Sequence, residues 1–174
     1  LPIYTFIDIV GLDPEAIELH FALGSLFRRR GEVERAIRIH QNLLQRPDLP
    51  EEQRVQARFE LGQDFLKAGL LDRAEETFHE LISGTYEAQA KRALLEIYQR
   101  EKEWRKAIEV AQALQNSGAG MRQTEIAQFY CELAQDELVH NRPEAAQSLL
   151  EQALAVDRHN VRATMLVGDV QKQR

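Results

Sequence analysis

The sequence predicts an all-α fold built from repeated helix hairpins. Valine and isoleucine are scattered at helical spacing and do not alternate as they would in strands. Residues that favour helices, namely Ala, Leu, Glu, Gln and Arg, are abundant. The chain also repeats itself with a period of roughly 34 residues. Because hairpins in such an array are stabilised mainly by their neighbours, the 174 residues are expected to form one elongated domain.

The repeat is visible when residues 21–37, FALGSLFRRRGEVERAI, are aligned with residues 59–75, FELGQDFLKAGLLDRAE. Phe, Leu-Gly, Phe, Gly and Arg-Ala recur at matching places. The alanine of the second helix recurs along the chain as Ala36, Ala74, Ala107 and Ala146. These landmarks predict four hairpins, at residues 17–50, 55–84, 88–118 and 127–158. Residues 1–14 are interpreted as a partial unit, and residues 161–174 as the start of a further repeat.

Small residues and turn glycines explain how each hairpin is expected to close. Two helices approach to roughly 8–10 Å only where side chains are small, which is the role expected of Gly24, Ala36, Gly62 and Ala74. Gly31 and Gly69 are expected to end the first helix in the left-handed conformation. The third unit departs from the pattern, since Leu95 replaces the small residue and Lys102 the turn glycine. The fourth keeps Ala134 but loses the aromatic residue of its first helix.

Composition excludes several classes of protein. The net charge of −6 disfavours general nucleic-acid binding, which depends on neutralising phosphates. The single cysteine, Cys131, allows neither an intrachain disulfide nor a thiol set for structural zinc. No apolar run approaches the roughly 20 residues of a membrane span, and no signal peptide is visible. The first residues read like the middle of a helical unit, so we expect the chain to be part of a longer protein.

The sequence contains no recognisable catalytic motif. It has no glycine-rich phosphate loop and no paired cysteines, and its five histidines are dispersed without ligand spacing. Cys131 has no basic residue close by in sequence and is interpreted as a small, partly buried packing residue. Trp104 is expected to open a second helix and to pack. We therefore expect a protein that is not an enzyme and that carries no cofactor.

The spaced residues resemble the tetratricopeptide repeat: Leu23-Gly24, Phe27, Gly31 and Ala36 match its pattern in one unit, and the next unit matches again. The resemblance implies a right-handed superhelical solenoid of helix-turn-helix repeats, with a concave groove lined by the first helix of each pair. Carried over position by position, the residues expected to face that groove as a partner-binding site are Phe21, Ser25, Arg28, Arg29, Phe59, Gln63, Lys67, Arg92, Glu96 and Arg100.

Five arginines fall within residues 28–38, RRRGEVERAIR, and two interpretations stay open. The cations are a solvated helix end, where the helix dipole favours positive charge. Alternatively, they make the groove net basic, so that it receives an acidic or extended peptide through arginine–carboxylate forks. The two-carboxylate clamp of some co-chaperone members is disfavoured, because Ser25 and Gln63 stand where asparagine would be expected.

Longer strings narrow the resemblance. Residues 23–44, 68–78, 103–114 and 124–134 closely resemble the lipopolysaccharide assembly protein B family of Gram-negative bacteria, and strings such as FYCELA are not demanded by helix packing. That family implies an inner-membrane protein with an N-terminal span, cytoplasmic repeats and a C-terminal rubredoxin-like zinc domain. It works with the membrane protease FtsH to control LpxC, the deacetylase that commits precursor to lipid A.

The resemblance implies a non-catalytic adaptor on the cytoplasmic face of the inner membrane that presents LpxC to FtsH. The zinc domain and the span would both lie outside this chain, which is expected to be soluble. We expect protein partners, no nucleic acid and no membrane insertion by this chain, and self-association is left open. The alternatives are a peptide-binding scaffold in another envelope-assembly complex and a helical-repeat RNA binder. The acidic charge and the lack of a repeated base-reading pair argue against the RNA binder.

Overall fold

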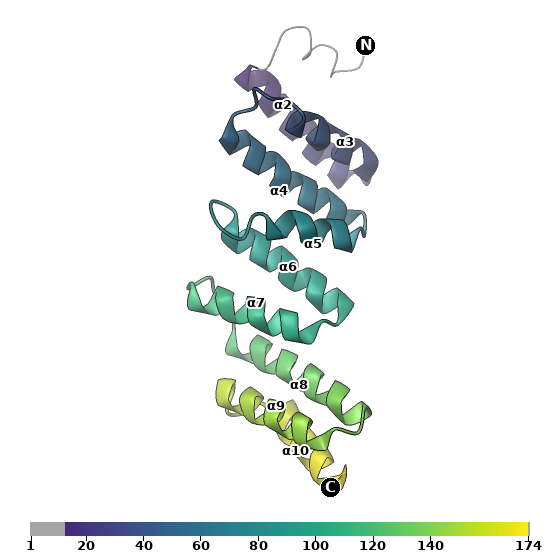
Figure 1. The fold of residues 1–174 in the computed structure, drawn as a ribbon, viewed down its shortest axis with the longest axis vertical. Helices are drawn as coiled ribbons and strands as arrows, with labels where there is room; N and C mark the ends of the chain where they lie inside the picture. Colours follow the sequence, from purple (N-terminus) through teal and green to yellow (C-terminus); the bar gives the residue numbers. More distant parts are fainter. Residues whose placement is uncertain (1–12, 174) are drawn as a thin grey trace. The chain divides into compact units, whose positions relative to one another are not determined.

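The computed structural model describes residues 13–173, and within that range the chain forms nine α-helices and no strand (Figure 1). The all-α class predicted from the sequence is therefore confirmed for this part of the chain. The predicted partial unit at residues 1–14 lies outside the described residues except for Asp13 and Pro14. The helices are α2 (Pro14–Arg29), α3 (Val33–Leu44), α4 (Glu51–Lys67), α5 (Leu71–His79), α6 (Glu87–Glu101), α7 (Trp104–Asn116), α8 (Gln123–Val139), α9 (Pro143–Val156) and α10 (Val161–Gln173).

The chain divides into two compact units, Leu1–Ala90 and Lys91–Arg174, and α6 begins in the first and ends in the second. In the first unit, α3 packs against both α2 and α4, and α5 packs against α4. In the second unit, α8 packs against α7 and α9, and α10 contacts both α8 and α9. Within each unit, the helices named here thus pack against their neighbours in sequence as the repeat pattern predicts, while the boundaries assigned to individual repeats remain a prediction.

The turn between the helices of each pair has the left-handed backbone that the glycine pattern predicts. Gly31 and Gly69 have φ angles of 81° and 77°. Lys102 and Asn141 occupy the corresponding turns after α6 and α8, with φ angles of 59° and 58°. A left-handed residue lets the chain leave a helix and reverse direction, and glycine does this at least cost. The later hairpins therefore keep the turn geometry after losing the glycine.

Each of the first two hairpins closes where a glycine faces a ring. A Cβ added to Gly24 would lie 2.6 Å from Nε2 of His40, and one added to Gly62 would lie 2.9 Å from the ring of Phe78. Ala36 and Ala74, on the second helices of the same hairpins, are fully buried. Gly24 and Gly62 are therefore confirmed as places where the paired helix approaches closely, and Ala36 and Ala74 are confirmed as buried.

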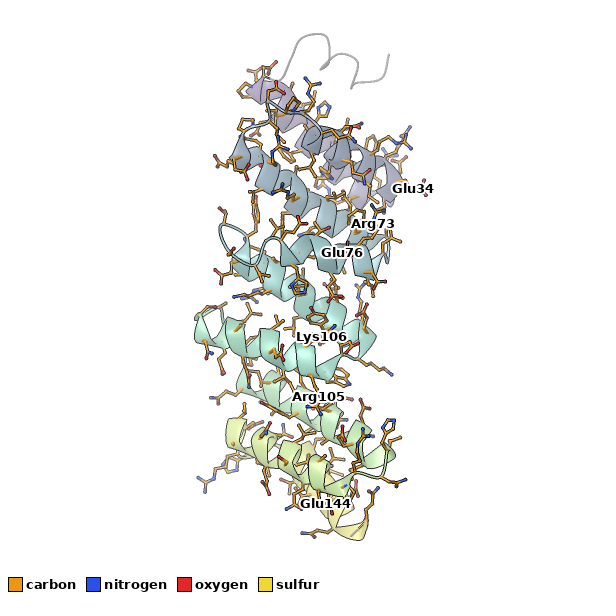
Figure 2. All side chains as sticks on the ribbon, in the orientation of Figure 1. Glu34, Arg73, Glu76, Arg105, Lys106 and Glu144 are labelled. Carbon is orange, nitrogen blue, oxygen red and sulfur yellow. The ribbon has the colours of Figure 1, made fainter. Side chains whose placement is uncertain are left out.

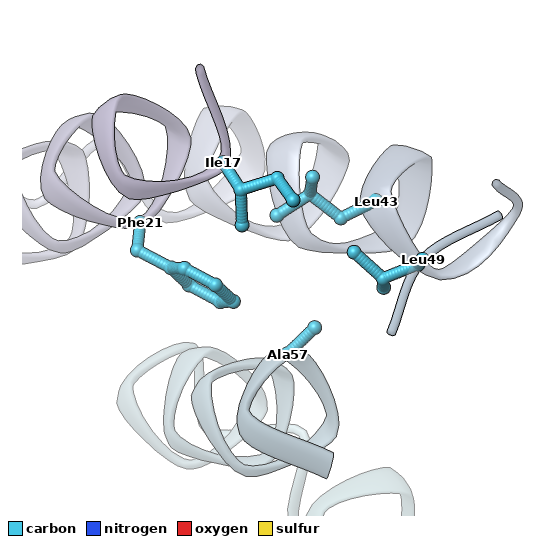
Figure 3. Packing of buried hydrophobic residues seen from close by; sticks show 5 residues of the cluster. All are labelled: Ile17, Phe21, Leu43, Leu49 and Ala57. Carbon is cyan, nitrogen blue, oxygen red and sulfur yellow. The ribbon is translucent and has the colours of Figure 1, made fainter. Parts of the chain in front are cut away.

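A small apolar cluster ties the first hairpin to the second. Ile17 and Phe21 of α2 pack with Leu43 of α3, with Leu49 of the following loop and with Ala57 of α4 (Figure 3). All five side chains are at most 9% exposed. Because this core contains residues from both hairpins, α2 and α3 cannot separate from α4 without exposing it to water.

An aromatic residue near the end of the first helix is covered by a cation from the second helix of the same hairpin. The Arg35 guanidinium lies 5.1 Å from the ring centre of Phe27, and that of Arg73 lies 4.4 Å from Phe65. The Lys106 ammonium lies 5.5 Å from the ring centre of Tyr98; Arg73 and Lys106 are labelled in Figure 2. Such contacts contribute roughly 0.5–1 kcal/mol at exposed sites.

The fourth hairpin replaces this contact with an ion pair. Glu137 occupies the position at which the repeat pattern places the aromatic residue. As noted from the sequence, the fourth unit lacks this aromatic residue. Its carboxylate accepts a hydrogen bond from the Arg142 guanidinium, and Arg105 lies 3.7 Å away. The hydrogen bond from Arg142 is the main cause that holds the pKa of Glu137 below its ordinary value of 4.5.

We predict opposite effects on stability for two glycine-to-alanine substitutions in helices. Gly62→Ala forces a methyl group onto the buried Phe78 ring and is expected to lower the free energy of unfolding by roughly 1–2 kcal/mol. Gly168→Ala, in α10, meets nothing within 4 Å and is expected to raise it by about 0.5–1 kcal/mol. Urea unfolding followed by circular dichroism would measure both, and equal stability of the two variants would contradict the assigned crossing.

The Glu137 ion pair predicts an acid-dependent loss of stability. Because the pKa of Glu137 is lowered in the folded chain, its contribution is present above the unfolded value near 4.5 and is lost as the pH falls below that value. Glu137→Gln should therefore flatten the decline of unfolding free energy below about pH 4.5. Glu109→Gln, at an exposed carboxylate of α7, is the control. Parallel declines for the wild type and Glu137→Gln would rule the contribution out.

Candidate partner-binding surfaces

The residues predicted to line a groove in the first unit have very different exposures. Phe21 is buried in the core and stacks with His40, with the ring centres 6.2 Å apart. Phe59 is half-buried and stacks on Tyr86 with the ring centres 4.5 Å apart. Ser25 and Gln63 are half-buried, whereas Arg29 and Lys67 are exposed. The structure therefore leaves the polar and cationic members more accessible than Phe21.

Arg28 is held between two carboxylates of the neighbouring hairpin. Its Nη1 donates to Oδ1 of Asp64 at 2.8 Å, and its Nη2 lies 2.8 Å from Oε2 of Glu60. The Arg28 side chain is only 16% exposed. Burial opposes the charge on Arg28, but the hydrogen bonds to Asp64 and Glu60 outweigh it and raise the pKa of the guanidinium. The interpretation of the arginines as a solvated helix end is therefore wrong for Arg28, and it fits the exposed Arg29 and Arg30.

Asp64 is shared with a second buried partner on α3. Its Oδ2 is hydrogen-bonded to Nδ1 of His40, and both side chains are completely buried. His40 takes the place in the first hairpin that Phe78 takes in the second, opposite the crossing glycine. A buried carboxylate is tolerated only when donors compensate for lost hydration, and here Arg28 and His40 supply them. This network joins α2, α3 and α4, and it keeps the Arg28 guanidinium turned towards Asp64 and Glu60.

The predicted groove residues of the second unit lie on α6 and are engaged locally. The Arg92 guanidinium donates to the carbonyl oxygen of Ala119. Arg100 pairs with Glu96 one helical turn away, with Nη2 and Oε1 2.6 Å apart. Exposed pairs of this kind are separable at little cost. The assignment of these ten residues to a partner-binding groove stays a prediction, and within the described residues only Arg29 and Lys67 are cations of that set without a partner.

A polar cleft in the second unit was missed by the sequence analysis. It has a volume of about 590 Å³, within the range of roughly 300–1,000 Å³ typical of ligand pockets. It lies between the last turn of α6, the first turns of α8 and the residue that precedes α10. Its lining residues are Gln99, Thr124, Glu125, Gln128, Phe129 and Asn160. The repeat register places Gln99 at the position that Arg28 occupies in the first unit, so Gln99 could have been identified from the sequence. Asn160 lies in a connection between helices, where the repeat register does not apply.

The family resemblance implies a zinc site in a further domain, and the residues that the structure describes do not form such a site. Residues 13–173 contain no group of three or more His, Cys, Asp or Glu side chains placed to hold a metal ion. Cys131 is fully buried, burial raises the pKa of its thiol, and its Sγ lies 3.7 Å from Oδ1 of Asn160. The prediction that Cys131 is a packing residue is confirmed, and the side chain is completely buried where partial burial was expected. Across the same range, no helix combines the length and the apolar composition that a membrane crossing requires.

Paired helices, left-handed turns and small residues at the crossings define a helical-repeat protein, and comparison with protein families agrees. Two family models described as tetratricopeptide repeat match residues 13–54 and residues 59–121 and 131–173. The chain belongs to the tetratricopeptide repeat family.

The chain is similar to curated lipopolysaccharide assembly proteins. It is 43% identical over 166 residues to lipopolysaccharide assembly protein B of Escherichia coli K12, covering 95% of this chain and 43% of that protein. The protein of the same name from Haemophilus influenzae is 40% identical over 157 residues, with 88% and 39% covered. The resemblance seen in the sequence is confirmed, and the chain spans less than half the length of these relatives.

Solved structures support the fold. MamA superposes with a TM-score of 0.53 at 18% identity, covering 90% of this chain and 81% of that one. A Podosopora anserina putative kinesin light chain with nearly identical TPR-like repeats gives a TM-score of 0.51 at 18% identity, with 92% of both chains covered. At such low identity these structures support the repeat fold alone.

We predict that the buried network is worth more than an exposed ion pair. Asp64→Asn removes the carboxylate that compensates Arg28 and His40, and it should lower the free energy of unfolding by about 3–5 kcal/mol. Glu96→Gln breaks the exposed pair with Arg100 and should cost at most about 1 kcal/mol. Both values come from urea unfolding at neutral pH. A loss below about 1 kcal/mol for Asp64→Asn would contradict the network's stabilising role.

Proposed function

We propose that this chain is the protein-binding scaffold of a lipopolysaccharide assembly protein. It acts without catalysis, holding the deacetylase LpxC where the membrane protease FtsH can degrade it on the cytoplasmic face of the inner membrane. The observation that carries this proposal is the similarity, 40–43% identical, to lipopolysaccharide assembly protein B across most of this chain. The protease and the deacetylase come from the family resemblance. The proposal extends to the relatives' remaining length, in which we place the membrane span and the zinc domain.

The fold supports an adaptor role because its stability does not depend on the surfaces offered to a partner. Buried rings facing a glycine hold the first two hairpins together, and the Arg28–Asp64–His40 network ties α2 and α3 to α4. Exposed helix residues are then free to vary with the partner. In the first unit, Arg29 and Lys67 are exposed cations near the ends of α2 and α4. They are suited to acidic side chains on a bound protein.

The test uses purified LpxC and purified FtsH with the immobilised 174-residue chain. We expect the immobilised chain to retain both LpxC and FtsH. Adding LpxC should not reduce the amount of FtsH that is retained. The double variant Arg29→Glu/Lys67→Glu should weaken LpxC binding at least about tenfold. High salt should weaken LpxC binding more for the wild type than for this variant, because the wild type retains the two cations. Arg28 is left unchanged, because reversing its charge would break the buried network instead of testing the surface.

Arg38→Glu is the matched control, since it reverses an exposed cation on α3 instead of one near the end of a first helix. An equal loss of binding in Arg38→Glu would mean that overall charge, and not the Arg29–Lys67 surface, governs capture. No retention of LpxC by the wild-type chain would contradict the deacetylase adaptor. Retention of LpxC without FtsH would support binding to the deacetylase and would contradict delivery by this chain.

A further inference from the structure

We propose that the contact of α2 with α3 and α4 is acid-sensitive, so that protonation of the buried His20 releases α2 while the second unit stays folded. The inference goes beyond the proposed function, because it concerns the packing of one helix and needs no partner. It has one consequence that rests on that function. Arg29 lies in the last turn of α2, so releasing the helix would also displace one cation of the Arg29–Lys67 surface.

His20 is the ionisable residue in the buried stripe of α2. That stripe consists of Ile17, His20, Phe21 and Gly24, and His20 is only 2% exposed. The apolar residues on either side, Ile17 and Phe21, pack into the cluster that α2 shares with α3 and α4 (Figure 3). A positive charge on His20 would therefore be held inside the contact that joins α2 to its neighbours, away from water.

The charged groups around His20 disfavour a proton on its ring. Burial is the largest cause that lowers the pKa of His20 below its ordinary value of 6.5. His40 on α3 and Arg46, in the loop after α3, lower it further, and the Nε of Arg46 lies 3.8 Å from Asp48. The hydrogen bond from Nδ1 of His20 to the carbonyl oxygen of Ala16, at 3.0 Å, acts in the opposite direction and does not outweigh burial.

The buried carboxylate of α4 is already engaged at this contact. Asp64 is hydrogen-bonded to Nδ1 of His40 and to Arg28. The other edge of the His40 ring faces the α2 backbone so closely that a Cβ added to Gly24 would lie 2.6 Å from Nε2. Water cannot enter this crossing to hydrate a charge unless the helices separate. A protonated His20 is therefore accommodated best by releasing α2.

The lowered pKa of His20 makes the closed contact sensitive to acid. Once α2 is released, the His20 ring is hydrated and its pKa returns towards 6.5, so the released state binds the proton more tightly than the closed state. The contribution of His20 to closure is complete above about pH 6.5 and is lost as the pH falls below that value. In this range the equilibrium constant for opening rises by at most about tenfold for each pH unit.

In the same pH range, acid is expected to act on the first unit and not on the second. The buried polar or charged residues among those described are His20, His40, Asp64 and Glu137. Glu137, which belongs to the second unit, has a pKa below its ordinary value of 4.5 and responds only at lower pH. The described histidines of the second unit, His140 and His159, are exposed. Weak acid therefore tests the contact at His20 separately from the Glu137 ion pair.

Hydrogen exchange measured by mass spectrometry on the intact 174-residue chain tests the inference. Protection factors, each relative to the intrinsic exchange rate at the same pH, report the opening of α2 and of α8. Between about pH 7 and about pH 5.5, the protection of α2 should fall by about threefold to eightfold. The protection of α8 should change by less than about twofold, because no buried histidine of the described residues lies in the second unit.

Two substitutions separate His20 from other titrating groups. His20→Gln keeps an N–H donor for the Ala16 carbonyl but cannot be protonated, and it should reduce the fall in α2 protection to less than about twofold. His79→Gln, at an exposed histidine of α5 in the same unit, is the matched control and should keep the wild-type fall. Circular dichroism at neutral pH checks that both variants are folded.

If His20→Gln fails to fold, the wild type still decides the question by nuclear magnetic resonance. The ring signals of His20 should titrate below pH 6.5, in the same range in which the amide groups of α2 lose their protection. The inference is overturned if the His20 ring titrates while α2 stays protected. It is also overturned if α2 and α8 lose protection in parallel, or if His20→Gln keeps the wild-type fall.

Retention of purified LpxC at the same two pH values separates this inference from the proposed function. If α2 opens in a His20-dependent way but LpxC is retained at neither pH, the acid-sensitive contact stands and the deacetylase adaptor fails. If LpxC is retained equally at both pH values and α2 stays protected in acid, the adaptor stands and this inference fails. Loss of LpxC in acid from the wild type and from His79→Gln, but not from His20→Gln, would support both.

Discussion

The close approach of two helices at a glycine is the constraint on which the rest of the structure depends. At Gly24 and Gly62 the absence of a Cβ lets a ring of the second helix reach the backbone of the first. That contact fixes the rotation of both helices about their axes, since only one face of each can meet there. Once the rotation is set, the buried and exposed faces of every helix follow from the 3.6-residue period.

Polar residues enter this packing only with a partner that compensates them. His40 stands where Phe78 packs in the next hairpin, and the Asp64 carboxylate that binds it is held in turn by Arg28. Glu137 stands where Tyr98 packs in the preceding hairpin, and Arg142 binds it. In both cases the exchange of an aromatic for an ionisable residue occurs together with an arginine. These two departures from the aromatic pattern are therefore each explained by a contact with a compensating residue.

The sequence predicted the features that depend on short, regular spacing. Gly31 and Gly69 in the turns and Gly24 and Gly62 at the crossings could all be predicted from the repeat register. The role of Arg28 could not, because its partners Glu60 and Asp64 lie 32 and 36 residues away on another hairpin. The register shows that two helices are neighbours, but not which of several nearby carboxylates a long side chain reaches. The cleft was not predicted for a related reason, because one of its lining residues, Asn160, lies in a connection between helices.

The cations over Phe27, Phe65 and Tyr98 have a consequence for how such a chain can evolve. Each ring is covered by a residue of its own hairpin: Arg35, Arg73 and Lys106 respectively. A hairpin of this kind carries its own cover, so duplicating or deleting it leaves no ring uncovered in its neighbours. The fourth hairpin has lost this autonomy, because Glu137 also lies beside Arg105 of the preceding helix pair. A change in repeat number would therefore leave the remaining rings covered, whereas loss of the first hairpin would still break the Arg28–Asp64–His40 network and loss of the third would remove Arg105 from Glu137.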